Sequence, residues 1–388
     1  MSWLGTIAKH VDYLSGRYEA LPVRDDTLRA AVMQVLDEVR RKELKRVHGS
    51  SALESAAFVD AEVPYQLYAL KDTRHDQVIG CVRVTRADHI ATLAQSREEY
   101  HLDEFPPELL ARSQVFTRLA ILRDYRKTAA SLVLFRRLGE DALAGGMVTT
   151  LLSCEPGLYA SYLRLGFRPL GSVHQGSSGG FRIPMVLMNH DLEHYRRVKS
   201  PMLAPLSAQA EATAGPASRE ALLWYRTLEA RTGTIDPGVA FYADNAGADG
   251  TGEGGDGIEV HAPLTRGLSA AGRAAVLHNA IEIPCHAGDV VLAAGDGGRN
   301  MGFVLSGAVQ AQIGGRTVSM VGEGELFGEI AVVMNTTRTA TLVAVGDDTR
   351  VLMLSQTCLD RLDDPADRTQ VWRNLAQVLA TRVIRFHE

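Results

Sequence analysis

Cysteine is scarce in this sequence, and its spacing excludes several kinds of site. The 388 residues contain four cysteines, and none belongs to a CxxC pair or to a Cys/His cluster: Cys81, Cys154, Cys285 and Cys358. A structural zinc site or a redox dithiol needs such spacing. We therefore expect reduced, buried thiols and no metal site.

Long apolar runs and long basic runs are also missing. No segment approaches the roughly 18 consecutive apolar residues of a membrane-spanning helix. The 41 basic and 46 acidic residues give a net charge of −5, so bulk binding to nucleic acid is disfavoured. These absences predict a soluble, cytoplasmic protein with no membrane span and no nucleic-acid partner. The 46% of apolar residues is enough for two or three folded units.

The pattern along the chain changes twice, which predicts three parts. Residues 1–199 alternate helix and strand signals. Residues 200–262 are first rich in Pro, Ala and Ser and then in Gly and Asp, which predicts a linker with one helix at 218–232. Residues 263–388 hold short strands punctuated by glycines, and a last helix at 367–385. The predicted fold class is α+β: a mixed sheet flanked by helices, followed by a β jelly-roll barrel with flanking helices.

The segment GEGELFGEIAVVMNTTRTATLVA, residues 322–344, combines the groups that a nucleotide needs. Gly328 and Glu329 open a helical turn, and the free backbone amides of Ile330 and Ala331 suit an anion. Arg338 is a bidentate phosphate donor. The Glu329 carboxylate suits a sugar hydroxyl, so the segment predicts a nucleotide pocket.

This segment resembles the cyclic nucleotide-binding domains of bacterial catabolite activators and protein kinase A regulatory subunits, over residues 262–386. The resemblance implies that Glu329 holds the ribose 2′-hydroxyl and that Arg338 binds the cyclic phosphate. It also implies amide donors and flanking residues, namely Gly328, Ile330, Ala331, Thr339 and Ala340. Cyclic AMP is favoured over cyclic GMP, although Thr339 supplies a hydroxyl of the kind associated with guanine. A homodimer through this half is expected. A role as a transcription factor is not, because no helix pair follows residue 366.

The loop RDYRKTAAS, between a predicted strand and a predicted helix, contains candidate binding residues of the N-terminal part. Arg126, Lys127 and the helix N-terminus would make an anion site. Tyr162, on a short helix after an apolar strand, is placed to donate a proton to a departing thiolate. Packing is the alternative role for this tyrosine.

Residues 20–199 resemble the GNAT acyltransferase superfamily, in the branch of acyl-homoserine-lactone synthases and long-chain N-acyl amino acid synthases. The resemblance rests on GCVRV (80–84), FPPELLARSQVFTRLAILRDYR (105–126) and LYASYLRLGFR (158–168). It implies that the donor's phosphopantetheine is held by Arg126, Lys127, Thr128, Ala129 and Ser131. Both glycines of the family's R-x-x-G-x-G/A signature are absent. This departure fits an arm on acyl carrier protein at least as well as coenzyme A.

The acceptor side of the implied enzyme is less complete. The acidic residue that often precedes the central arginine of this branch, here Arg118, is missing. Glu155 and Glu108 are the substitutes that we consider for a catalytic carboxylate. Arg83 and Arg118, on neighbouring strands, are expected to hold a substrate carboxylate, and surface or structural pairing is the alternative role.

These resemblances together predict an acyltransferase that moves an acyl group from acyl carrier protein or coenzyme A to a small-molecule amine such as an amino acid. Cyclic nucleotide binding to the C-terminal domain would regulate it. One alternative is a cyclic-nucleotide-regulated protein lysine acetyltransferase that uses acetyl-CoA. Another is a non-catalytic sensor of acyl groups and a second messenger.

Overall fold

The structure is a computed structural model. It describes residues 16–39, 63–126, 128–171, 173–175, 180–232, 263–277, 280–295, 300–334, 336–355, 359 and 362–385. The chain divides into two compact units. The N-terminal unit comprises Met1–Cys154, Ser161–Ser172 and Ile183–Ile235, and the C-terminal unit comprises Glu155–Ala160, Val173–Arg182 and Asp236–Glu388.

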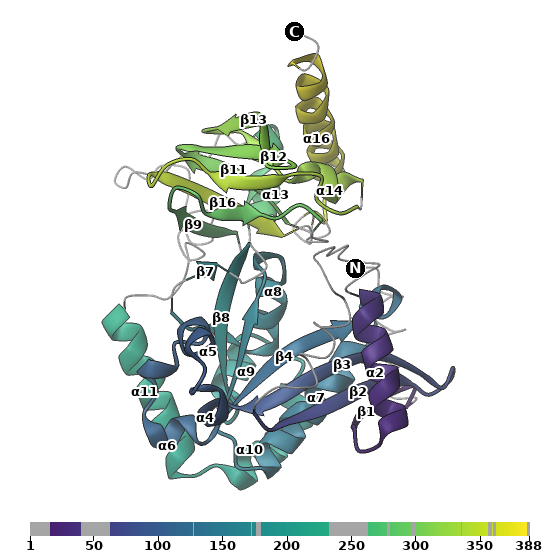
Figure 1. The fold of residues 1–388 in the computed structure, drawn as a ribbon, viewed down its shortest axis with the longest axis vertical. Helices are drawn as coiled ribbons and strands as arrows, with labels where there is room; N and C mark the ends of the chain where they lie inside the picture. Colours follow the sequence, from purple (N-terminus) through teal and green to yellow (C-terminus); the bar gives the residue numbers. More distant parts are fainter. Residues whose placement is uncertain are drawn as a thin grey trace. The chain divides into compact units, whose positions relative to one another are not determined.

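A mixed sheet organises the N-terminal half (Figure 1). Its strand order is β1-β2-β3-β4-β5-β8-β6, with β7 paired to the start of β8. All neighbours are antiparallel except β4 and β5. The strands are β1 (Tyr18–Pro22), β2 (Tyr65–Asp72), β3 (Gln77–Arg86), β4 (Ser113–Ile121), β5 (Thr149–Cys154), β6 (Arg168–Pro169), β7 (His174–Gln175) and β8 (Phe181–Met188). The strand-like runs at 65–71 and 77–85 predict a hairpin, and the antiparallel pairing of β2 with β3 confirms it.

Helices cover both faces of this sheet. Helix α2 (Asp26–Glu38) starts at Asp25, whose side chain accepts a hydrogen bond from Leu28 N at 2.8 Å. Helix α7 (Ala130–Ala144) lies behind the sheet in Figure 1, and α2 lies in front. The others are α4 (Ala87–Ile90), α5 (Ala94–Glu99), η2 (Leu102–Glu104), α6 (Pro107–Leu110), η3 (Arg123–Tyr125), α8 (Pro156–Leu165) and α9 (Leu192–Arg197).

Two further helices occupy residues for which the sequence predicts a linker with one helix. Helix α10 (Leu203–Thr213) packs against α7. Helix α11 (Pro216–Thr232) packs beside η2. The centroids of the Trp224 and Phe105 rings are 4.2 Å apart, and Trp224 Nε1 donates to Glu104 O at 2.8 Å. The N-terminal unit thus extends beyond the predicted boundary at residue 199, and residues 233–262 lie outside the described part of the chain.

The C-terminal unit is a double-sheet β structure. One sheet has the order β10-β15-β12-β13 and the other β14-β11-β16-β9. The strands are β9 (Ile281–Cys285), β10 (Val290–Leu292), β11 (Asn300–Ser306), β12 (Ala308–Ile313), β13 (Arg316–Gly322), β14 (Leu326–Phe327), β15 (Thr341–Ala344) and β16 (Thr349–Ser355). The helices are η4 (Pro263–Thr265), α13 (Ala270–Leu277), α14 (Glu329–Val333) and α16 (Pro365–Arg385). Buried residues such as Met301, Phe303, Leu352 and Leu375 form its core.

The predicted α+β fold class is confirmed by these two units. The expectation of reduced, buried cysteines is confirmed for Cys81, Cys154 and Cys285, which are buried thiols outside any disulfide of the described residues. Cys358 lies outside the described residues.

Candidate functional site

Strands β4 and β5 separate partway along their length. Their parallel pairing runs from Ser113↔Thr149 to Phe116↔Leu152 and stops there, although β4 continues to Ile121 and β5 to Cys154. Beyond this point, the edge of β4 that faced β5 no longer pairs with it. A strand edge that lies outside the ladder can bind an extended ligand that carries amide groups.

A β-bulge in β4 marks the same point. Cys81 pairs with Ala120 and Arg83 with Thr117, so Arg118 and Leu119 together lie opposite Val82. Arg118 has a left-handed backbone, with φ of 56°, and is exposed. A bulge next to a strand separation re-aims side chains and releases backbone groups, which is why such features cluster at functional sites. The structure confirms that Arg83 and Arg118 lie on neighbouring strands, and their binding role stays a prediction.

The predicted phosphopantetheine loop connects the end of β4 to α7. Arg126 Nε donates to Ile121 O at 2.7 Å, which holds the loop against the strand. The Thr128 hydroxyl donates to Tyr125 O at 2.7 Å and accepts from Ala130 N at 3.2 Å, in the first turn of α7. Ala129 is buried, Ser131 is half-buried, and Lys127 lies outside the described residues. The start of α7 thus lies at the end of β4 that has separated from β5.

Tyr162 lies in an aromatic cluster. Its ring makes edge contacts with Phe135, at 6.1 Å between centroids, and with Phe167, at 5.6 Å. The side chain is buried. This packing fixes the ring, and the predicted role of its hydroxyl as a proton donor stays a prediction. Glu155 belongs to the other compact unit and pairs with Arg182 at 3.3 Å, so its catalytic role also stays a prediction.

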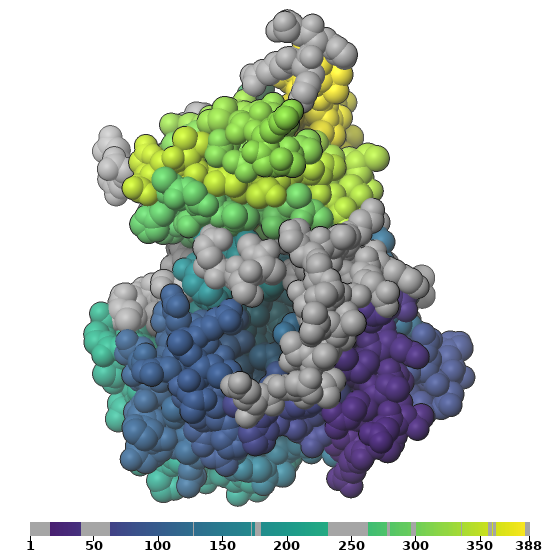
Figure 2. Space-filling view, in the orientation of Figure 1, coloured from purple at the N-terminus to yellow at the C-terminus, as the bar shows by residue number. Residues whose placement is uncertain are grey.

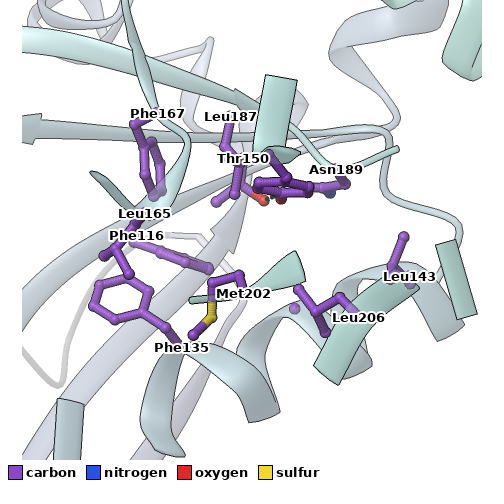
Figure 3. A pocket seen from close by; sticks show the side chains of 12 residues that line it. Phe116, Phe135, Leu143, Thr150, Leu165, Phe167, Leu187, Asn189, Met202 and Leu206 are labelled. Atoms are coloured by element: carbon purple, nitrogen blue, oxygen red, sulfur yellow. Dashed lines mark hydrogen bonds between the residues drawn. The ribbon is translucent and has the colours of Figure 1, made fainter. Parts of the chain in front are cut away.

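A small cavity lies between the sheet and the helices α7, α9 and α10 (Figure 3). Its walls are mostly apolar and include Phe116, Phe135, Leu143, Leu187, Met202 and Leu206. The volume of about 20 Å³ has room for one water molecule, not for an acyl chain. The buried Tyr195 hydroxyl, which also lines it, has no hydrogen-bond partner among the described residues, and burial raises its pKa. A water molecule here would satisfy that hydroxyl.

The C-terminal unit brings together the predicted phosphate and ribose residues. Arg338 is 5% exposed, and its Nη1 donates to Gly328 O at 2.6 Å. Its Nη2 donates to Asn300 Oδ1 at 2.6 Å and to the Asn300 carbonyl. These bonds hold the planar guanidinium beside the start of α14, where a phosphate would meet it.

Glu329 is fully buried and forms an ion pair with an arginine that the sequence did not predict for this site. Arg382 of α16 donates from Nη1 to Glu329 Oε1 and from Nη2 to Leu326 O. Glu329 Oε2 is buried and has no hydrogen-bond partner among the described residues. One carboxylate oxygen is therefore held by the chain, and the other is available as an acceptor for a hydroxyl donor.

The remaining residues predicted for this pocket surround the same turn. Ala331 is buried, Ile330 is 39% exposed, Thr339 is exposed and Ala340 is half-buried. Asn300 and Arg382 were missed because they lie 38 residues from Arg338 and 53 residues from Glu329, respectively, on elements with no local motif.

Gly328 is required by its backbone, which has φ of 75° at the start of α14. A Cβ atom there would lie 2.8 Å from Leu292 Cδ1 and 3.0 Å from Arg338 Nη1. We expect Gly328→Ala to destabilise the domain by about 1–2 kcal/mol from the left-handed conformation alone and to weaken nucleotide binding by moving Arg338. Thermal unfolding and calorimetric titration check this. A variant that matches wild type in both would contradict it, and Gly314→Ala, in the β12–β13 turn, is the control for backbone strain away from the pocket.

The family comparison identifies the C-terminal unit. Residues 282–364 match the family model of the cyclic nucleotide-binding domain. These residues contain Asn300, Gly328, Glu329 and Arg338, whose geometry is given above. Residues 282–364 of the C-terminal unit are therefore a cyclic nucleotide-binding domain.

Comparisons with individual proteins match parts of the chain. A 76-residue segment is 37% identical to Rap guanine nucleotide exchange factor 1 of Caenorhabditis elegans, but spans only 7% of that protein's length and 20% of this chain. The catabolite activator protein of Thermus thermophilus is 31% identical over 32% of this chain and 60% of its own, with a TM-score of 0.28. An N-acyl amino acid synthase from uncultured soil microbes is 15% identical over 48% of this chain and 97% of its own, with a TM-score of 0.36.

The described residues contain neither a candidate membrane span nor a candidate metal cluster. None of the helices there is both long and apolar enough to cross a membrane. The described part of the chain also holds no group of three or more His, Cys, Asp or Glu side chains arranged to bind a metal ion.

Proposed function

We propose that the N-terminal unit is an N-acyltransferase and that cyclic nucleotide binding regulates it. The observation that carries the proposal is the separation of β4 from β5 at Phe116↔Leu152, with the start of α7 at the far end of the separated strand. A phosphopantetheine arm has amides for the β4 edge beyond the last β4–β5 pair and a phosphate for the helix N-terminus. The arm belongs to acyl carrier protein or to coenzyme A.

The proposed reaction is direct aminolysis of a thioester. A neutral amine attacks the thioester carbonyl, so that a C–N bond forms and the C–S bond breaks. Backbone amides at the strand separation would stabilise the negative charge on the carbonyl oxygen. The departing thiolate takes a proton, which we assign to the Tyr162 hydroxyl, and the amine loses one to solvent or to a base.

A mass-spectrometric assay with two donors tests this function. The full chain is incubated with long-chain acyl carrier protein or with acyl-CoA, together with a pool of amino acids. The proposal expects an N-acyl amino acid from at least one donor. Acetylation of protein lysine from acetyl-CoA with no N-acyl amino acid would favour the lysine acetyltransferase. No product from either donor would favour a non-catalytic sensor.

The C-terminal domain is proposed to bind cyclic AMP in preference to cyclic GMP, with the phosphate on Arg338 and the ribose 2′-hydroxyl on Glu329. Arg382 links this pocket to α16, because it holds the Glu329 carboxylate from that helix. Regulation needs a ligand that favours one arrangement of the chain over another. A homodimer through this half, and acyl carrier protein as a partner, remain part of the proposal.

Substitution of Arg382 tests this link. In Arg382→Gln, the buried Glu329 loses its charged partner, so the carboxylate is no longer held in place for a ribose hydroxyl. We expect affinity for cyclic AMP to fall about tenfold, with little change for 2′-deoxy cyclic AMP, measured by calorimetric titration. Arg373→Gln, at an exposed position of the same helix, is the matched control. An equal loss for both nucleotides would show that Arg382 does not act through the ribose site.

A further inference from the structure

Three polar side chains lie in one row on the sheet face that carries α4. Arg83 of β3 pairs directly with Thr117 of β4, so their side chains share a face. The last β4–β5 pair is Phe116↔Leu152, and Thr117 and Ser153 are the next residues on the two strands. Ser153 therefore continues the row on β5. Phe116, one residue earlier, lines the cavity on the α7 side.

Each member of this row has a buried polar atom without a hydrogen-bond partner among the described residues. The atoms are Arg83 Nε, Thr117 Oγ1 and Ser153 Oγ. Buried polar atoms are normally paired, so three adjacent exceptions need an explanation. All three are hydrogen-bond donors, and one of them carries a positive charge.

A second Ser/Thr pair on the same two strands shows why the row is unpaired. Ser113 and Thr149 lie four residues earlier on β4 and β5, on the same face, and their hydroxyl oxygens are 2.5 Å apart. At that level the strands are paired, the two hydroxyls share a hydrogen bond, and Ser113 Oγ also donates to Leu109 O at 2.7 Å. Thr117 and Ser153 lie where the strands have separated, so each hydroxyl is left for another acceptor.

The surroundings of Arg83 favour an anionic ligand. Its guanidinium lies over the Tyr65 ring, 4.6 Å from the centroid, which orients it. Among the described residues, Tyr65 and Tyr100 are the ionisable groups that act electrostatically on it, and burial lowers its pKa. A half-buried cation beside tyrosines binds an anion with a more favourable free energy than a cation that is already paired with a carboxylate.

The sheet face that carries this row lies between two groups of helices. Helix α2 lies at one side and α4, α5 and α6 lie at the other, with β3 and β4 crossing between them (Figure 1). The space-filling view shows a hollow beside the blue segment that contains α4, α5 and α6 (Figure 2).

We infer that Arg83, Thr117 and Ser153 form a carboxylate-binding subsite, which would hold the carboxylate of the amino-acid acceptor in the proposed function. A carboxylate has lone pairs enough for all three donors. The subsite lies at the level where β4 and β5 separate, beside the place proposed for the thioester. The identity of the ligand as acceptor rests on the proposed function, but the carboxylate site does not.

A binding experiment that needs no turnover tests the subsite. The probes are N-octanoylglycine and its methyl ester, which lacks the negative charge and carries one extra methyl group, titrated into the full chain. We expect the acid to bind at least tenfold more tightly than the ester, the scale of a charge-assisted hydrogen-bond pair. The preference should disappear in Arg83→Gln and fall severalfold in Thr117→Val and Ser153→Ala. Arg74→Gln, at the exposed β2–β3 turn, should retain it.

Stability separates a ligand site from a structural role. Because Thr117→Val and Ser153→Ala remove unpaired buried hydroxyls, we expect their melting temperatures to equal or exceed that of wild type while the preference for the acid falls. Equal binding of acid and ester to wild type, or loss of the preference in Arg118→Gln but not in Arg83→Gln, overturns the inference. A retained preference with no acyl transfer from any donor would instead count against the proposed function alone.

Discussion

Arg338→Gln is expected to weaken cyclic nucleotide binding about 100-fold. The guanidinium is buried beside the α14 turn, where a charge-assisted bidentate contact with phosphate is worth the most. Glutamine keeps a polar group that can reach Gly328 O or Asn300, so part of the local hydrogen bonding survives. Arg338→Lys keeps the charge but loses the planar fork, and we expect an intermediate loss.

Calorimetric titration with cyclic AMP and cyclic GMP measures this effect. Thermal unfolding of each variant establishes that the barrel is still folded, because Arg338 also connects Gly328 to Asn300. Arg316→Gln, in the exposed β12–β13 turn, is the charge-matched control. Wild-type affinity in a folded Arg338→Gln protein would show that the phosphate binds elsewhere.

Tyr162→Phe is expected to lower the rate of acyl transfer about 100-fold at saturating donor, within the range of general acid catalysis. Phenylalanine keeps the ring contacts with Phe135 and Phe167, so stability should change little. The Michaelis constants should also change little, because the hydroxyl is assigned to proton transfer and not to binding.

Tyr195→Phe is the matched control for this substitution. It removes a buried hydroxyl that has no hydrogen-bond partner among the described residues, at the wall of the small cavity. Transfer rates should match wild type in this variant. If Tyr162→Phe also transfers at the wild-type rate, the thiolate obtains its proton from another group and the assignment of Tyr162 is wrong.

The sequence predicted those helices and strands whose hydrophobic pattern lies within one short segment. The alternation in 65–71 and 77–85 fixes the β2–β3 hairpin, and the apolar spacing of 131–146 fixes α7. Helix α10 was missed because Pro205 and the surrounding Ala and Ser residues are typical of a linker. Pro205 lies in the first turn of that helix, where a backbone donor is not needed.

The same distinction holds for the sites. Glu329 and Arg338 lie nine residues apart in one recognisable segment. Arg382 and Asn300 reach the pocket only through tertiary packing. The row of Arg83, Thr117 and Ser153 depends on strand register and on where two strands separate, which no local pattern encodes.

One coupled assay tests the central claim that a cyclic nucleotide regulates acyl transfer in this chain. Transfer from acyl carrier protein to an amino acid is measured by mass spectrometry, with and without cyclic AMP, for wild type and Arg338→Gln. The account predicts a product whose rate changes with cyclic AMP in wild type and does not change in the variant. A rate that is the same with and without the nucleotide, in protein shown to bind it, would contradict regulation.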